Sequence, residues 1–251
     1  MRSPSIVAAL LFLLFPSVAQ AAEIQLLASG ALKEAYLELL PNFEAASGHN
    51  VKVTWSNTTD LQKRVAGGEA ADLAILGNNG TEALIRDGKL VASTRAAFAT
   101  SGIYVAVRVG APAPDISSAD ALKRSVLAAK SVAYSGGASG TYIVIMLQKL
   151  GIYDEVVAKA SVTKPNEPVG GRVARGDAEI GFHQLSELIP VNGIDIVGPL
   201  PAELQEITVF SGALHSAAKE PGAATALVKF LTAPAAADTL KRHGLAPAVA
   251  N

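Results

Sequence analysis

Short polar turns follow the apolar stretches of this chain, and they are built from residue types that bind anions. Each turn precedes a stretch with helical spacing. The turns are Ser29-Gly30-Ala31, Asn57-Thr58-Thr59 and Ser139-Gly140-Thr141. A helix N-terminus presents free N–H groups and a partial positive charge, and small residues let an anion approach the backbone. The same residue types cap helices, so a single turn fits either role. Several such turns in one chain favour a shared anion site.

His183 is the candidate residue for acid–base chemistry. It ends an apolar stretch typical of a strand and is followed by Gln184, at the end where open α/β sheets place ligands. An imidazole there either is a hydrogen-bonded core residue or faces a ligand. Facing a ligand, it can donate to an anion or accept and return a proton. Tyr142 and Glu187 are further candidate partners, although Glu187 also fits a solvent-exposed charge at a helix start.

Several other kinds of chemistry are disfavoured by composition and spacing. The chain has 251 residues, no cysteine and a net charge of −1, which argues against thiolate metal sites and nucleic-acid binding. The four histidines are not spaced as metal ligands are. The stretch 136–140 lacks the Lys-Ser/Thr pair of a P-loop, and 137–141 does not match the serine-hydrolase elbow. We therefore expect neither a cofactor nor a metal.

The elements that must position these residues alternate between strand and helix. Apolar strands are predicted at 23–28, 51–55 and 72–76, and again at 102–109, 131–134, 178–183 and 206–211. Helical spacing lies between them, for example at 32–46 and 142–150. This alternation predicts an α/β fold in which mostly parallel sheets are flanked by helices. Pro41 is expected to kink or divide the first helix.

The first residues have the pattern of a secretory signal peptide. Arg2 precedes an apolar run over 6–15, and Ala19-Gln20-Ala21 supplies a small-residue cleavage site. The run is shorter than the roughly 20 residues that span a bilayer. We expect residues 1–21 to be removed, which leaves a soluble, exported chain that starts at Ala22 and resides in the periplasm.

Longer stretches of the sequence carry a family resemblance. They are 27–32, 56–61, 67–73, 139–142 with 147–151, 173–181 and 230–237. In these stretches the chain resembles the type II periplasmic binding proteins, in particular the molybdate-binding branch of the ABC-transporter receptors. The resemblance implies two lobes joined by two crossing strands. One lobe would comprise residues 22–100 and 204–251, and the other residues 101–203.

The resemblance also implies where a ligand would lie and how it would be held. In the molybdate receptors, hydroxyls and backbone N–H groups of the turns and a tyrosine after a late strand hold the oxyanion. Here Ala31 stands at the serine position of the first turn, Asn57-Thr58-Thr59 replaces a serine run, and Gln184 stands at the tyrosine position beside His183. The implied binding residues thus coincide with the polar turns, His183 and Gln184.

Two functions remain open on this scaffold. The first is a monomeric periplasmic receptor that captures a small anion, either a molybdate-like oxyanion or a small di- or tricarboxylate, for the membrane subunits of an ABC importer. Side branches of the family resemble receptors for small organic anions, and one exported relative isomerises aconitate. The alternative is therefore an isomerase of an unsaturated tricarboxylate, with His183 as the base.

Overall fold

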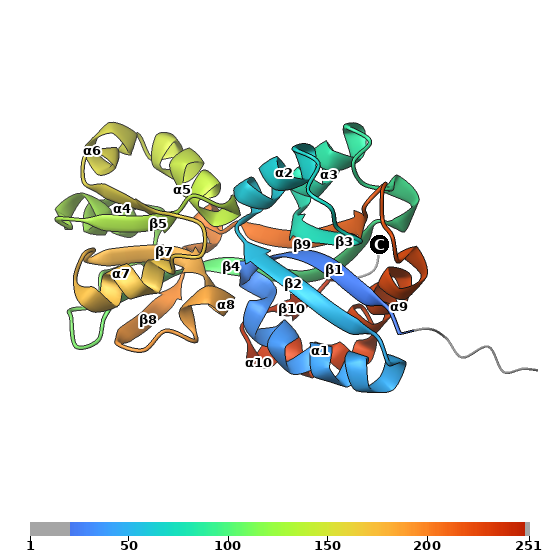
Figure 1. Ribbon diagram of the computed structural model, residues 1–251. Helices are drawn as coiled ribbons and strands as arrows, with labels where there is room; N and C mark the ends of the chain where they lie inside the picture. The colour runs from blue at the N-terminus through green and yellow to red at the C-terminus, as the bar shows by residue number, and fades with distance from the viewer. Residues whose placement is uncertain (1–20, 249–251) are drawn as a thin grey trace, which may run out of the picture.

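The computed structural model describes residues 21–248, which form two lobes that share one curled sheet (Figure 1). The predicted signal peptide lies outside these residues except for Ala21. The strand order is β2-β1-β3-β9-β4-β7-β5-β6, with β8 and β10 added beside β4. No helix within 21–248 combines the length and the apolar character that crossing a membrane requires.

Three parallel strands form the centre of the first lobe. They are β1 (Glu23–Ser29), β2 (Asn50–Ser56) and β3 (Leu73–Gly77), with β1 between the other two. Helices cover both faces. They are η1 (Gly30–Leu32), α1 (Lys33–Ser47), α2 (Thr58–Ala66), α3 (Asn78–Arg86) and η2 (Ala92–Thr94). Successive β1 residues enter different cores, Leu26 on the α1 side and Leu27 on the α2 side, as the period of two in a strand requires.

Strand β4 (Ala96–Arg108) links the lobes because it is long enough to belong to both. Its first half pairs antiparallel with β9 (Ile207–Leu214), and its second half pairs antiparallel with β7 (Ile180–Gln184) and β8 (Ile194–Pro199). The chain returns from β8 through η3 (Ala202–Leu204) into β9. The two crossings that the family resemblance implied are therefore present.

The second lobe repeats the parallel arrangement on the left of Figure 1. Strand β5 (Val132–Ser135) lies between β7 and β6 (Ala160–Thr163), and both pairings are parallel. The helices of this lobe are α4 (Ala119–Ala128), α5 (Ala138–Lys149), α6 (Tyr153–Val157), α7 (Val169–Arg175) and α8 (Leu185–Leu188). Its main core lies under α4, α5 and α6, and a smaller core lies under α7.

The C-terminal elements return to the first lobe. They are α9 (Pro221–Leu231), η4 (Pro234–Ala236), α10 (Ala237–Arg242) and β10 (Ala246–Pro247). Leu227 and Leu240 share a core with Ile24 and Tyr36, and β10 pairs with β4. The parallel centre of each lobe agrees with the fold class expected from the sequence.

The structure corrects two local predictions. Pro41 does not divide the first helix, because α1 runs unbroken from Lys33 to Ser47 with the proline on its exposed side. Pro41 has no N–H to donate to the carbonyl of Leu37, four residues earlier. Leu37 is 53% exposed, so water can donate a hydrogen bond to that carbonyl instead. The second error concerns 139–141, which lie inside the first turn of α5 rather than in a loop before it.

Candidate functional site

The carboxyl ends of five strands from both lobes meet at one cavity of about 510 Å³. Open α/β sheets bind ligands at this position. The cavity is lined by Gly30, Lys33, Glu34, Trp55, Ser56, Asn57, Ser135, Thr163, Lys164, Asn166, Glu167, Pro168, His183, Ser186, Glu187, Pro190 and Val191. The first lobe contributes the residues up to Asn57 and the second lobe the remainder.

Three residues of the second lobe lie in one row across its sheet. Thr163 pairs with Ser135, and the pairing of Tyr134 with Phe182 places Ser135 beside His183 one residue further on. Side chains of one row project from the same face of a parallel sheet. The row therefore presents two hydroxyls and one imidazole to the same cavity.

His183 and Glu187 form the central titratable pair. The imidazole is buried, and its Nε2 lies 3.3 Å from Oε2 of Glu187, one turn along the chain. Burial raises the pKa of the Glu187 carboxyl above its ordinary value, and positive charge on His183 opposes that shift. With Glu187 ionised, Nε2–H would donate to it and leave Nδ1 as the basic nitrogen, the arrangement by which a carboxylate orients a catalytic histidine.

Four buried polar atoms around this cavity have no hydrogen-bond partner among the described residues. They are Ser56 Oγ, Thr163 Oγ1, His183 Nδ1 and Ser186 Oγ. Buried polar groups in proteins are almost always hydrogen-bonded, so a cluster of exceptions needs an explanation. Their common position on one cavity leaves all four available to a molecule that occupies it.

A small pocket of about 20 Å³ adjoins the cavity, with which it shares Asn57, Ser135, His183 and Glu187. The N-terminus of α5 lies here, and no side chain caps it. Ser135 Oγ is 3.0 Å from Ser139 Oγ and accepts from the N–H of Gly137. The uncapped helix start gives this pocket the positive end of a helix dipole.

The structure brings most of the predicted binding residues to these two spaces. Gly30, Asn57 and His183 line the larger cavity, and Ser29, Asn57, Thr58, Ser139, His183 and Gln184 line the smaller pocket. Thr59 and Thr141 instead line a separate cavity between α2 and α5. Ala31 and Gly140 line none of these three spaces.

The turns also use their side chains for capping, as the alternative interpretation anticipated. Ser29 accepts from Ala31 N–H at 3.4 Å, and Asn57 accepts from Asp60 N–H at 2.9 Å. Thr58 Oγ1 accepts from Gly77 N–H at 3.0 Å. An accepting hydroxyl still has its own hydrogen to donate, so capping and anion binding are compatible for serine and threonine.

Gln184 bonds to the crossing strands. With its amide nitrogen toward Ser101 O at 3.1 Å and Gly102 O at 3.2 Å, its amide oxygen accepts from Thr208 Oγ1 at 2.7 Å. Ser101 and Gly102 belong to β4 and Thr208 to β9, the two connections between the lobes. The amide therefore ties β7 to both connections beside the smaller pocket.

One family model spans nearly the whole described chain. The model of the bacterial extracellular solute-binding proteins matches residues 24–246. The chain belongs to this family. An aconitate isomerase from a Pseudomonas species is 38% identical to it over 230 residues, 89% of this chain and 87% of that protein. The molybdate-binding protein ModA of Azotobacter vinelandii is 26% identical over 243 residues, 92% of each chain.

Solved structures of periplasmic binding proteins have the same fold. The periplasmic molybdate-binding protein of Azotobacter vinelandii gives a TM-score of 0.73 at 18% identity, over 91% of this chain and 100% of that chain. The sulfate-binding protein SubI of Mycobacterium tuberculosis gives 0.74 at 19%, over 90% and 87%. The chain therefore has the fold of the type II periplasmic binding proteins, as the sequence resemblance predicted.

This solute-binding protein has cavity residues that the sequence did not single out. They include Lys33, Ser56, Ser135, Thr163, Lys164 and Ser186. Ser56, Ser135 and Thr163 are the last residues of β2, β5 and β6, so a hydroxyl at the end of an apolar strand was the available signal. Glu187, proposed as a solvent-exposed helix-start charge, lies in the first turn of α8 but faces His183.

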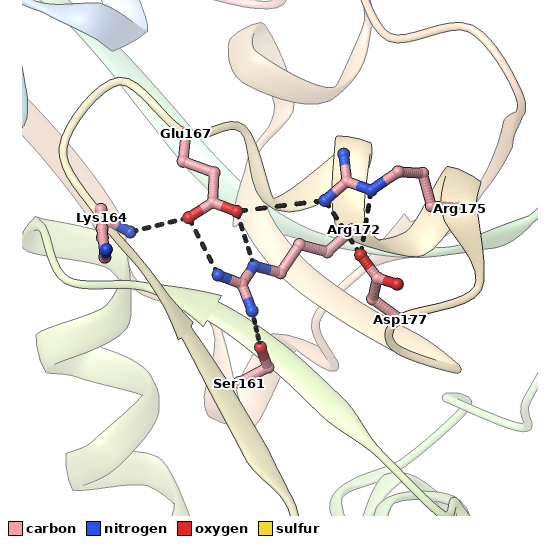
Figure 2. A network of polar contacts seen from close by, with 6 residues as sticks. All are labelled: Ser161, Lys164, Glu167, Arg172, Arg175 and Asp177. Atoms are coloured by element: carbon pink, nitrogen blue, oxygen red, sulfur yellow. Dashed lines mark hydrogen bonds and ion pairs between the residues drawn. The ribbon is translucent and has the colours of Figure 1, made fainter.

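The loop from β6 to α7 contributes Lys164, Asn166, Glu167 and Pro168 to the lining of the cavity. A charged network holds this loop (Figure 2). Glu167 accepts from Nε and Nη2 of Arg172, at 2.8 and 3.0 Å, and from the N–H of Lys164 at 3.2 Å. Arg172 also contacts Ser161, and Arg175 pairs with Asp177. The network anchors the loop to α7, so the positive charge of Arg172 is engaged by Glu167.

Proposed function

We propose that this protein binds a small unsaturated polycarboxylate between its lobes and isomerises it by moving a proton, with His183 as the base. The observation that carries this proposal is the pairing of buried His183 with half-buried Glu187 in the cavity, with Nε2 and Oε2 3.3 Å apart. Capturing an anion needs donors but no titratable pair. General acid–base catalysis, by contrast, requires a positioned group that accepts and returns a proton, and the His183–Glu187 pair provides one.

The size and lining of the cavity support an organic anion over a compact oxyanion. At about 510 Å³ the cavity is in the range of pockets for small organic ligands. Two lysines and four unpartnered polar atoms line it, on several sides. A carboxylate at either end of an elongated molecule could use donors that a tetrahedral oxyanion in one corner would leave without partners. The 38% identity to an aconitate isomerase agrees with this choice.

The proposed reaction is an allylic proton shift that needs no external oxidant or reductant. A neutral His183 takes a proton from the methylene carbon of the substrate, and the electron pair of that C–H bond forms a new double bond. The old double bond becomes the electron pair that accepts the same proton at the far carbon. The negative charge that develops on a carboxylate is stabilised by hydroxyl donors, for which Ser56 and Ser186 are available.

Glu187 would position the imidazole in this reaction. Ionised, it accepts from Nε2–H and fixes the tautomer in which Nδ1 is basic. It also stabilises the imidazolium that exists while the proton is in transit. Burial raises the pKa of Glu187, and positive charge on His183 lowers it, so Glu187 ionises more readily when the imidazole is protonated.

A second candidate function is capture of a small anion for the membrane subunits of an ABC importer. The molybdate-binding relative and the shared two-lobed fold favour it. In this case His183 would act only as a hydrogen-bond donor. The two functions use the same cavity and differ in whether the imidazole must accept a proton.

The test is turnover of cis- and trans-aconitate, followed by ultraviolet absorbance, with the parent, His183→Gln and the control His49→Gln. His49 lies outside the cavity and accepts from Ala22 N–H. We expect the parent and the control to interconvert the two isomers and His183→Gln to be slower by about 10²–10⁴-fold. The saturated analogue tricarballylate should still bind His183→Gln, because an amide can donate to an anion.

Binding of an anion by the parent without any isomerisation would overturn the isomerase and favour the receptor. Turnover that survives in His183→Gln would show that another group is the base.

A further inference from the structure

One side of the cavity carries polar groups that the proton shift does not use. They lie at the end of β6 and on the loop to α7, and Thr163 there is 3% exposed with a hydroxyl that has no partner among the described residues. Resting on the proposed function, we propose that Thr163 and Lys164 form a subsite for a second carboxylate of the ligand, which selects tricarboxylates over shorter dicarboxylates.

The position of Thr163 sets a distance from the reacting centre. Thr163 and His183 lie in one row with Ser135 between them, so two strand spacings, about 10 Å, separate their backbones. The imidazole faces the reacting carbon, so a carboxylate that reaches the Thr163 hydroxyl belongs to an arm of the ligand beyond that carbon. A dicarboxylate with one arm fewer lacks this group.

Lys164 supplies charge at the same end. It lines the cavity directly after Thr163, and across the gap Lys33 of the first lobe lines the opposite wall. Within residues 21–248 neither ammonium group has an ion-pair partner. Glu167 at this wall is already neutralised by Arg172, which leaves Glu34 and Glu187 as the other carboxylates that line the cavity. A carboxylate would gain from both lysines.

The loop that carries Lys164 is shaped before any ligand arrives. Glu167 N–H donates to the carbonyl of Lys164 at 3.1 Å, and the Glu167 carboxylate accepts from the N–H of Lys164 (Figure 2). Asn166 completes the turn with φ at 63°, a conformation that asparagine tolerates better than most residues. Because the turn is fixed, little ordering would oppose binding at this end.

The experiment measures Kd by calorimetry for tricarballylate and for succinate, which lacks the third carboxylate. The variants are Thr163→Val, Thr163→Ser and Lys164→Met, with Lys149→Met at the end of α5 as the matched control outside the cavity. We expect Thr163→Val and Lys164→Met to weaken tricarballylate about ten- to a hundredfold and succinate less than about threefold. Thr163→Ser and the control should behave like the parent.

Equal weakening of both ligands, or unchanged tricarballylate binding, would overturn the subsite while leaving the isomerase intact. A parent that binds neither carboxylate would overturn the proposed function and the subsite together. The Thr163→Ser variant separates loss of the hydroxyl from loss of folding, because it keeps the hydroxyl at a similar volume.

Discussion

Gly140 should be intolerant of even a single added methyl group, and the reason is packing rather than ligand contact. It is the third residue of α5, and a Cβ there would lie far inside contact distance of the Ser135 carbonyl oxygen and carbon. Real Cβ atoms essentially never come within 3.0 Å of such atoms. Both partners are backbone, so the substitution Gly140→Ala must push the start of α5 away from the end of β5.

The expected cost follows from what that displacement breaks. Overpacking costs typically about 1–3 kcal/mol. Separating α5 from β5 also strains the Ser135–Ser139 contact and the bond from Gly137 N–H to Ser135, worth about 1 kcal/mol each. The better helix propensity of alanine returns about 1 kcal/mol. The net loss is about 2–4 kcal/mol of unfolding free energy, or a Tm lower by roughly 5–15 °C for a chain of this size.

The assay is thermal unfolding followed by circular dichroism, with tricarballylate titration of the folded variant. Gly222→Ala is the matched control, because Gly222 lies in the first turn of α9 and a Cβ there would meet nothing within 4 Å. The control should keep or slightly raise Tm. Ligand binding by Gly140→Ala should fall as well, since Ser135 and Ser139 line the candidate site. A Tm for Gly140→Ala within about 2 °C of the parent would refute the reasoning.

Two further predictions concern buried polar groups. Tyr36→Phe should raise the unfolding free energy by about 1 kcal/mol in urea denaturation, because the buried Tyr36 hydroxyl has no partner among the described residues; a loss of stability would indicate that the hydroxyl is satisfied. Glu187→Gln should be more stable than the parent at pH 7 and equal to it below about pH 4, measured as Tm without ligand. Burial raises the pKa of Glu187, so the folded parent holds its proton more tightly than the unfolded chain and loses stability as pH rises from about 4.5. An unchanged Tm difference across that range would contradict this assignment.

The sequence was informative where local pattern and tertiary structure agree. Strand–helix alternation predicted the parallel centre of each lobe, and polar turns at strand ends predicted residues such as Asn57 and His183 that meet at one cavity. The start of α5 could not be predicted, because glycine is a poor helix former and Gly140 therefore argued against a helix at this position. The reason for a glycine there is its close approach to the Ser135 backbone, which only the structure shows. Thr163 was missed because β6 is four residues long and no helix follows it directly.

The cost of the unpartnered groups identifies where the binding energy would come from. Leaving a buried polar atom without a partner costs about 1–3 kcal/mol, and four such atoms surround one cavity. A ligand that supplies partners to Ser56, Thr163 and Ser186 should therefore bind more tightly than one that leaves them without a partner. A saturating tricarboxylate should accordingly raise Tm more than any single substitution at the cavity lowers it. At equal concentration, a ligand that reaches Thr163 and His183 together should give a larger rise in Tm than one that reaches only one of them.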